Sequence, residues 1–293
     1  MSEEARKDRL APVVETVDAV REAVIAAKRR GLRVGFVPTM GALHAGHRSL
    51  IEAAKRECGF VITSIFVNPT QFAPHEDLAK YPRPLDADRR LCAAAGADLV
   101  FHPGVETIYP SGFSTFVTVE GLSNILEGKF RPTHFRGVTT VVCKLFQMVP
   151  ADFAFFGQKD YQQQTIIRKM VAELNIPIRT RVCPTVREPD GLALSSRNVY
   201  LSHDERRSAL ALSRSLTLAH EYLAQGGSDF DLIRQRMWAL LKETPLVEPD
   251  YATLVDPDTL EDVSTAVHTV VALVAARVGQ TRLIDNDVID LPG

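Results

Sequence analysis

Short apolar runs alternate with amphipathic stretches over the first 183 residues of the chain. The amphipathic stretches have a helical period, whereas the apolar runs are short and rich in β-branched residues, which is typical of strands. Helices are predicted at 16–30, 46–57, 86–95, 138–148 and 160–174, and strands at 34–37, 60–67, 97–102, 152–156 and 178–182. Because these strands are apolar nearly throughout, the alternation predicts an α/β fold with a parallel sheet covered on both faces.

The pattern changes near residue 184, where two prolines, Asp190 and Gly191 form a turn-rich connection. Two charged helical stretches and three strand-like runs follow, at 203–225, 229–243, 249–255, 268–276 and 281–289. We therefore predict two domains, 1–183 and 184–293. The acidic run at 285–290 is interpreted as a solvated edge strand without a functional role.

Composition narrows the classes of function. The 293 residues are 45% hydrophobic and 24% charged, as in ordinary globular proteins. A formal net charge of -2 argues against a general nucleic-acid binder, which usually carries a basic excess. We expect neither secretion nor membrane insertion, because no signal-peptide core and no apolar run of about 20 residues is found. The cysteines form no Cys-x-x-Cys pair, which favours a reducing cytoplasm over a disulfide framework or a zinc ribbon: Cys58, Cys92, Cys143 and Cys183.

Three polar clusters each follow a predicted strand, at 39–47, 68–72 and 157–163. In open parallel sheets, ligands bind beyond the carboxyl ends of the strands. The clusters are therefore expected at the ligand-binding edge of the sheet.

His44 and His47 lie three positions apart at the start of a predicted helix. Such residues share one helix face, and a helix N-terminus attracts anions through its free N–H groups and partial positive charge. Gly41 and Gly46 allow close approach of the backbone to a bound triphosphate. Two other interpretations stay open: an ordinary surface or packing role, and a shared zinc ion, for which no third ligand stands nearby.

Two further segments carry candidate phosphate-binding side chains. The run SSRN at 195–198 offers two hydroxyls, a guanidinium and an amide, which suit the charge developing on a leaving pyrophosphate. A serine-rich loop at a helix cap has much the same sequence. In FGQKD at 156–160, Lys159 is a candidate phosphate ligand and Asp160 a candidate N-cap.

Glutamines form a fourth group, with Gln71 after one strand and Gln162, Gln163 and Gln164 opening a helix. Side-chain amides bind a hydroxylated carboxylate without adding net charge. A solvated polar face is the default interpretation for any one of them.

These segments, in this order, closely resemble the pantothenate synthetase (pantoate–β-alanine ligase) family, whose nucleotidyltransferase superfamily has the signature His-x-Gly-His. The resemblance rests on PTMGALHAGH at 38–47, NPTQF at 68–72, YPR at 81–83, HFRGV at 134–138, FGQKD at 156–160 and SSRN at 195–198. It implies a Rossmann-like, doubly wound parallel sheet at 1–183 that binds nucleotide and pantoate. A smaller α+β domain at 184–293 would then act as a lid, in a cytoplasmic homodimer with no nucleic-acid or membrane partner.

The implied reaction is the ATP-dependent condensation of (R)-pantoate with β-alanine by a ligase that forms a C–N bond. Pantoate and ATP give pantoyl adenylate and pyrophosphate, and β-alanine then gives pantothenate and AMP. The substrates are pantoate, β-alanine and ATP, and Mg²⁺ is expected to bridge the phosphates.

The resemblance also implies roles for single residues. The catalytic group is His44, His47, Lys159, Ser195, Ser196 and Arg197, with His47 at the position the family labels as proton donor. The ATP-binding segments are Met40, Gly41, Ala42, Leu43, His44, Ala45, Gly46, His47, Gly157, Gln158, Lys159, Asp160, Val186, Leu194, Ser195, Ser196 and Arg197. Gln71 and Gln163 match the pantoate site, Gln71 also lies near β-alanine, and Asp88 is the candidate metal contact.

Two positions depart from the family pattern. Ala87 stands where some relatives carry a further acid beside Asp88, which leaves metal contact the weakest assignment. Leu194 stands where relatives commonly have methionine, a swap that conserves volume and apolar character. Two rival functions stay open: another His-x-Gly-His nucleotidyltransferase, and a non-catalytic nucleotide-binding module.

Overall fold

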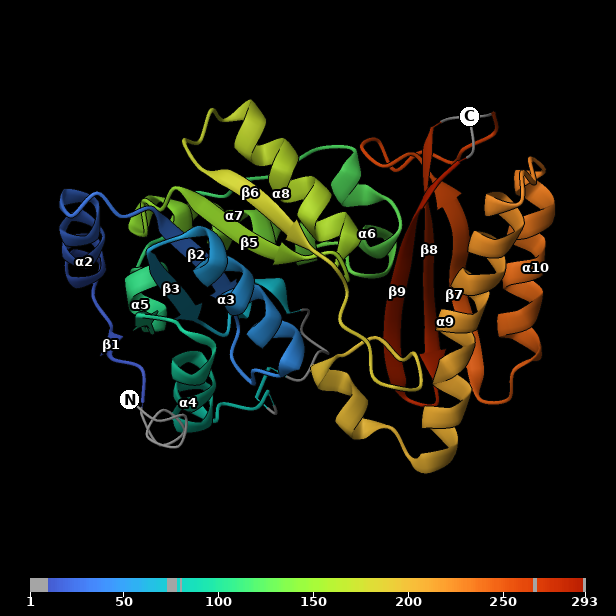
Figure 1. Cartoon of the computed structure of the whole chain (residues 1–293), viewed down its shortest axis with the longest axis horizontal. Coiled ribbons are helices and arrows are strands. Elements are labelled where there is room, and N and C mark those ends of the chain that lie inside the picture. The colour runs from blue at the N-terminus through green and yellow to red at the C-terminus, as the bar shows by residue number, and fades with distance from the viewer. Residues whose placement is uncertain (1–9, 73–77, 80, 266–267, 292–293) are drawn as a thin grey trace. The chain divides into compact units, whose positions relative to one another are not determined.

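The computed structural model describes residues 10–72, 78–79, 81–265 and 268–291 (Figure 1). The chain divides into two compact units, and each is described by itself. The first unit contains 1–157 and 166–184, and the second contains 158–165 and 185–293. Residues 1–9, where no signal peptide is expected, lie outside the described residues.

The first unit is built around a parallel sheet with helices between its strands. Its strands are β1 (Val13–Val14), β2 (Val34–Thr39), β3 (Phe60–Ile65), β4 (Leu99–Phe101), β5 (Phe153–Gly157) and β6 (Arg179–Cys183). Its helices are α2 (Val17–Arg29), α3 (Ala45–Glu57), α4 (Leu85–Ala95), α5 (Val105–Ile108), α6 (Glu127–Phe130) and α7 (His134–Met148), with 3-10 turns η1 (Pro69–Gln71) and η2 (Leu122–Asn124). Helix α8 (Tyr161–Glu173) begins in the second unit and continues into the first.

The strand order β1-β4-β3-β2-β5-β6 reverses direction between β2 and β5. All described pairings in this sheet are parallel, and β2 meets β5 in the register Gly35↔Phe153 and Phe36↔Ala154. The reversal is the topological switch point of a doubly wound sheet, where such folds bind their ligands. The carboxyl ends of β2 and β5 therefore flank the expected ligand position.

Alternate residues of the strands pack against helices on opposite faces of the sheet. On β2, Val37 joins a buried cluster with Leu50 and Ile51 of α3, whereas the ring of Phe36 packs edge-on against Phe146 of α7, with centroids 6.4 Å apart. Both faces are thus apolar, which explains why the strand sequences do not alternate with polar residues.

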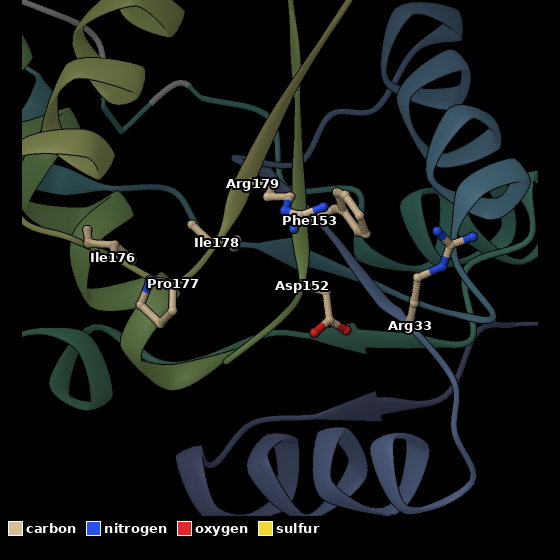
Figure 2. A pocket seen from close by; sticks show the side chains of 7 residues that line it. All are labelled: Arg33, Asp152, Phe153, Ile176, Pro177, Ile178 and Arg179. Atoms are coloured by element: carbon tan, nitrogen blue, oxygen red, sulfur yellow. The ribbon is translucent and has the colours of Figure 1, made fainter.

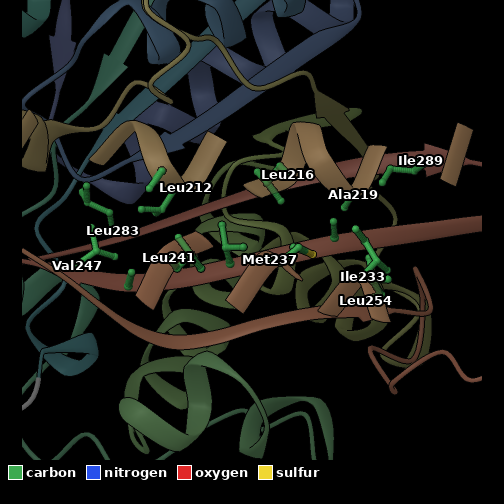
Figure 3. Packing of buried hydrophobic residues seen from close by; sticks show 14 of the residues in the cluster. Leu212, Leu216, Ala219, Ile233, Met237, Leu241, Val247, Leu254, Leu283 and Ile289 are labelled. Carbon is green, nitrogen blue, oxygen red and sulfur yellow. The ribbon is translucent and has the colours of Figure 1, made fainter. Parts of the chain in front are cut away.

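The second unit is an antiparallel sheet covered by two helices. Its sheet has the order β7-β8-β9, and its elements are η3 (Ser196–Tyr200), α9 (His203–Ala224), α10 (Phe230–Glu243), β7 (Val247–Val255), β8 (Thr269–Val278) and β9 (Thr281–Asp290). Side chains of α9 and α10 meet the sheet in one apolar core, among them Leu216, Ile233 and Met237 (Figure 3). Helix α9 begins with a capping box, in which Ser202 Oγ accepts from Glu205 N at 3.3 Å and Glu205 Oε2 accepts from Ser202 N at 2.8 Å.

The predicted α/β fold class, with a smaller α+β part after it, is confirmed. Each predicted helix and strand is present within a few residues of its expected bounds, and the short elements β1, α5 and α6 were not predicted. The interpretation of 285–290 as solvated is wrong for Asp285 and Asn286, which are 4% and 2% exposed. No helix among the described residues is long and apolar enough to cross a membrane.

Candidate active site

The loop between β2 and α3 has a strained backbone that Asp88 holds in place. Gly41 and Ala42 both have positive φ, at 86° and 51°. A Cβ on Gly41 would lie 3.0 Å from Asp88 Oδ2, so a larger residue there would be strained by its positive φ and would also crowd the Asp88 carboxylate. Asp88 Oδ2 accepts from Ala42 N at 2.9 Å, and Asp88 Oδ1 accepts from Leu43 N at 2.8 Å. Burial raises the pKa of Asp88, while these two N–H donors act to lower it.

His44 and His47 are brought side by side at the start of α3, with ring centroids 4.2 Å apart. His44 is the N-cap, and its Nδ1 accepts from Gly46 N at 3.1 Å. His47 Nδ1 accepts from His44 N at 3.3 Å, which completes a capping box made of histidines. Because each Nδ1 is an acceptor, each neutral ring carries its proton on Nε2. The caps therefore fix both rings as Nε2–H donors.

Gln71 lies in η1, after the neighbouring strand β3, and is 8% exposed. Its Oε1 accepts from Asn68 Nδ2 at 3.2 Å, and its Nε2 lies against Met40 Sδ. The side chain thus connects the loops that follow β2 and β3. Asn68 Nδ2 also donates to Gly137 O at 3.1 Å, which joins η1 to helix α7.

Several polar residues around Gln71 received no role from sequence reasoning. His134 Nδ1 lies 3.1 Å from Gln71 O, and Arg131 Nη1 lies 3.2 Å from His134 Nε2. Because Arg131 can only donate, His134 accepts at Nε2 and donates its Nδ1 proton to Gln71 O. The Tyr109 hydroxyl donates to Asn68 Oδ1 at 2.8 Å. The HFRGV motif was the available signal for His134 and the NPTQF motif for Asn68, although neither indicates which atoms meet; Arg131 and Tyr109 lie in neither motif.

In the second unit, the turn at 158–160 leads directly from the end of β5 into α8. Lys159 is half-buried, and its Nζ lies 3.8 Å from Asp160 Oδ1. The backbone carbonyls of Gln158 and Lys159 both accept from Asn286 Nδ2, at 3.0 and 2.8 Å. Asp160 is exposed and immediately precedes the helix, where an N-cap residue stands.

The segment 186–194 is a tight hairpin that delivers the serine-rich run. Leu194 N donates to Val186 O at 2.9 Å, and Gly191 has a positive φ of 93° at the turn. Ser195 then caps η3, because its Oγ accepts from Arg197 N at 3.2 Å. The side chain of Arg197 is exposed, whereas Ser195 and Ser196 are half-buried.

The three consecutive glutamines at the start of α8 differ in burial. Gln162 and Gln164 are 5% and 2% exposed, whereas Gln163 is half-buried. The default interpretation of a solvated polar face is therefore wrong for Gln162 and Gln164. Gln163, the residue matched to the pantoate site, belongs to the second unit and Gln71 to the first.

A cavity of about 530 Å³ lies at the opposite edge of the parallel sheet (Figure 2). Its lining comes from the residues that precede or begin β2, β5 and β6, with Arg33, Asp152 and Arg179 as the charged groups. None of the predicted site residues lines it. Ligands of parallel sheets bind at the carboxyl edge, and this cavity is at the other edge. It is therefore not part of the candidate active site.

The predicted residues therefore fall into two groups. The first unit brings together Met40–His47, Gln71 and Asp88 and also contains Gly157, and the second contains Gln158–Asp160, Gln163, Val186 and Leu194–Arg197. Among the described residues, no three His, Cys, Asp or Glu side chains cluster in a way that would hold a metal ion by themselves.

The sequence pattern of the "Pantoate-beta-alanine ligase" family matches residues 12–288. The chain belongs to this family. It is 52% identical over 279 residues to "Pantothenate synthetase" of Moorella thermoacetica, covering 95% of this chain and 99% of the relative. It is therefore a ligase of the class that joins pantoate to β-alanine.

Solved structures of the family agree with the fold. The pantothenate synthetase of Thermus thermophilus is similar with a TM-score of 0.89 at 48% identity, over 94% of this chain and 98% of that one. The pantoate-beta-alanine ligase of Francisella tularensis is similar with a TM-score of 0.75 at 33% identity, over 95% and 97% of the two chains. That protein is described as complexed with beta-gamma ATP and beta-alanine.

Proposed function

We propose that this chain condenses (R)-pantoate with β-alanine through a pantoyl adenylate, consuming ATP and releasing AMP and pyrophosphate. Family membership supports the overall reaction. The observation that supports the site is where two motifs begin: the His-x-Gly-His loop follows β2, GQKD starts at the last residue of β5, and these two strands meet at the topological switch point.

In the first step, a pantoate carboxylate oxygen bonds to the α-phosphorus of ATP, and the bond from that phosphorus to the bridging oxygen breaks. Like charges must be held in line while negative charge grows on the pyrophosphate. We assign stabilisation of this charge to the Nε2–H groups of His44 and His47, to Lys159, and to the run Ser195–Arg197. These donors are worth most in a transition state from which water is excluded.

Gln71 and Gln163 are the proposed pantoate ligands, and Gln71 is also placed near β-alanine. A buried amide suits this role because it offers a donor and an acceptor without charge. The hydrogen bond from Asn68 fixes which way the Gln71 amide faces.

The residues present fit a Mg²⁺ ion that is held mainly by phosphate oxygens. The Asp88 carboxylate accepts two hydrogen bonds from backbone N–H groups, and its oxygens keep lone pairs for a further contact. When bound, Mg²⁺ neutralises phosphate charge. Asp88 is the proposed protein contact, direct or through water. If Asp88 contacts the ion, Asp88→Asn raises the Mg²⁺ concentration needed for half-maximal rate. If the substitution only lowers kcat at saturating Mg²⁺, Asp88 serves only as the anchor of the loop.

In the second step, the unprotonated amine of β-alanine bonds to the acyl carbon, loses a proton and expels AMP. The adenylate must be protected from water, and we propose that residues 184–293 act as a lid that does so. Solution scattering with and without an ATP analogue tests this, and an unchanged profile contradicts closure.

A cytoplasmic homodimer is also proposed, for which sedimentation equilibrium measures the mass of the assembly.

The reaction itself is tested with the purified chain supplied with ATP, pantoate, β-alanine and Mg²⁺. AMP, pyrophosphate and pantothenate are expected in equal amounts. Without β-alanine, pantoate should still support exchange of labelled pyrophosphate into ATP. Formation of ADP, or turnover that is indifferent to pantoate, would contradict the proposal and favour another nucleotidyltransferase. Complete inactivity of the folded chain would favour a non-catalytic module.

A further inference from the structure

Asp285 and Asn286 are buried polar residues of β9 that lie outside every segment assigned above to the substrates. Neighbouring residues of a strand point to opposite faces, so the two side chains reach different partners. Polar groups buried to this degree are retained where hydrogen bonds satisfy them, and both of these residues are bonded.

Asn286 holds the turn at 158–160 by its backbone. Its Nδ2 donates to Gln158 O at 3.0 Å and to Lys159 O at 2.8 Å, and its Oδ1 accepts from Gln158 Nε2 at 3.3 Å. One planar amide thus fixes two successive carbonyls immediately before α8. The Cα of Lys159 cannot shift without breaking at least one of these bonds.

Asp285 holds the hairpin at 186–194 through Arg187. Its two carboxylate oxygens accept from Arg187 Nη1 at 2.6 Å and Nη2 at 2.9 Å, a two-pronged pairing that fixes orientation as well as distance. Arg187 Nη1 also donates to Gly191 O at 3.1 Å, and Nη2 donates to Asn286 O at 3.3 Å. The guanidinium therefore connects β9 to the hairpin that leads into Ser195.

We propose that Asp285 and Asn286 of β9 are a pair of positioning residues. Asn286 holds Lys159, and Asp285 holds the Ser195–Arg197 run through Arg187. One strand thus fixes the separation of the two segments. The inference rests on the proposed function, in which both segments bind the phosphates of ATP. An ammonium and a row of donors act on the same leaving group only if their spacing matches it, and a misplacement of about 1 Å lowers rates by about 10²-fold. Neither residue touches substrate in this role.

Asn286→Ala removes all three hydrogen bonds to the turn. In pantoate-dependent exchange of pyrophosphate into ATP, we expect kcat to fall by about 10- to 100-fold and the KM for ATP to rise several-fold, with the pantoate KM within about twofold of wild type. A merely structural defect lowers the active fraction and leaves the ATP KM unchanged. An unchanged ATP KM therefore overturns the proposal.

Coupling to Lys159 is the sharper test. If Asn286 acts through Lys159, then Asn286→Ala in a Lys159→Ala background costs less than about threefold, because the group that it positions is already gone. Additive effects of the two substitutions would overturn the proposal. Asp290→Asn is the matched control, since Asp290 lies on the same strand, is exposed and bonds through its side chain only to Thr269 Oγ1 among the residues that the structure describes.

A second variant covers the case in which Asn286→Ala fails to fold. Arg187→Lys keeps the positive charge but loses the two-pronged pairing with Asp285, and it should raise the ATP KM in the same way. Hydrogen exchange should then rise in the amides of 186–198, and unchanged exchange with an unchanged ATP KM would contradict the proposal. Exchange activity of the wild-type chain is measured first, so that its absence marks failure of the proposed function rather than of this inference.

Discussion

At the residue scale, His44 and His47 each have two separate tasks on one ring. Nδ1 of each ring caps the start of α3, and Nε2 is left as the proton-bearing nitrogen. A single substitution to alanine removes both tasks together. The tasks can be separated, because the Oδ1 of asparagine stands about where Nδ1 stands in histidine.

We expect His44→Asn and His47→Asn to keep the cap and lose the donor. Each should lower kcat for adenylate formation by about 10² to 10³, the usual effect of losing one transition-state donor. Thermal unfolding should stay near that of the wild type, whereas His44→Ala should also lose about 1 kcal/mol as an N-cap deletion. Pyrophosphate exchange and calorimetry measure the two effects. An asparagine variant that keeps near-wild-type exchange would show that its histidine is only a cap.

Two cysteine thiols should be inert in the native chain. Burial raises the pKa of Cys58 to about 11 and that of Cys92 to about 12. Since the thiolate is the reactive form, iodoacetamide at about pH 8 should leave both unmodified until urea is added, and mass spectrometry should find the half-buried Cys143 and Cys183 modified first. Equal native rates for Cys58 and Cys183 would contradict this.

The raised pKa of Cys58 fixes the sign of a pH effect on stability. The folded state binds the Cys58 proton more tightly than the unfolded state, whose thiol keeps the ordinary pKa of 9.0. The free energy of unfolding should therefore fall as pH rises from about 9 to about 11. A Cys58→Ser variant, compared with wild type over that range, isolates this contribution, and identical slopes for the two proteins would exclude it.

At the element scale, the period of the apolar residues was sufficient to predict the main helices and strands. It could not predict β1, whose two residues are too few to form a pattern. The motifs located the loops around the switch point, because a motif is local. Burial of Gln164, Asp285 and Asn286 depends on what other elements bring against them, and no local pattern carries that information.

Close packing of α7 on η1 sets the position of Gln71. A Cβ on Gly137 would lie 2.5 Å from Thr70 O, which is backbone and cannot swing aside. Gly137→Ala should therefore displace η1, raise the KM for pantoate more than that for ATP, and cost about 1 to 3 kcal/mol of stability. Steady-state kinetics and urea unfolding measure these effects.

Gly104→Ala is the matched control for that change. A Cβ at Gly104 meets nothing within 4 Å, and its φ of -72° is ordinary for any residue. The control should therefore keep both KM values and most of the stability. Equal pantoate KM values for the Gly137→Ala and Gly104→Ala variants would mean that contact of α7 with η1 does not position Gln71.

At the scale of the whole molecule, each unit has its own apolar core. The first unit has a cluster that includes Ile51 of α3, and the second has a cluster that includes Ile233 of α10. Both isoleucines are fully buried, so they are matched probes of the two cores. Because each cluster draws its residues from one unit, we expect damage to one core to stay within that unit.

Ile51→Ala and Ile233→Ala should each cost about 2 to 5 kcal/mol in the unit that holds the cavity. Hydrogen exchange resolves the location: Ile233→Ala should speed exchange in α9, α10 and β7 to β9 while the amides of β2, β3 and β5 keep their protection, and Ile51→Ala should do the reverse. Loss of protection over the whole chain in either variant would mean that the two units unfold as one. In that case the second unit could not unfold separately during the catalytic cycle. Movement of the proposed lid would then have to be movement of a folded domain.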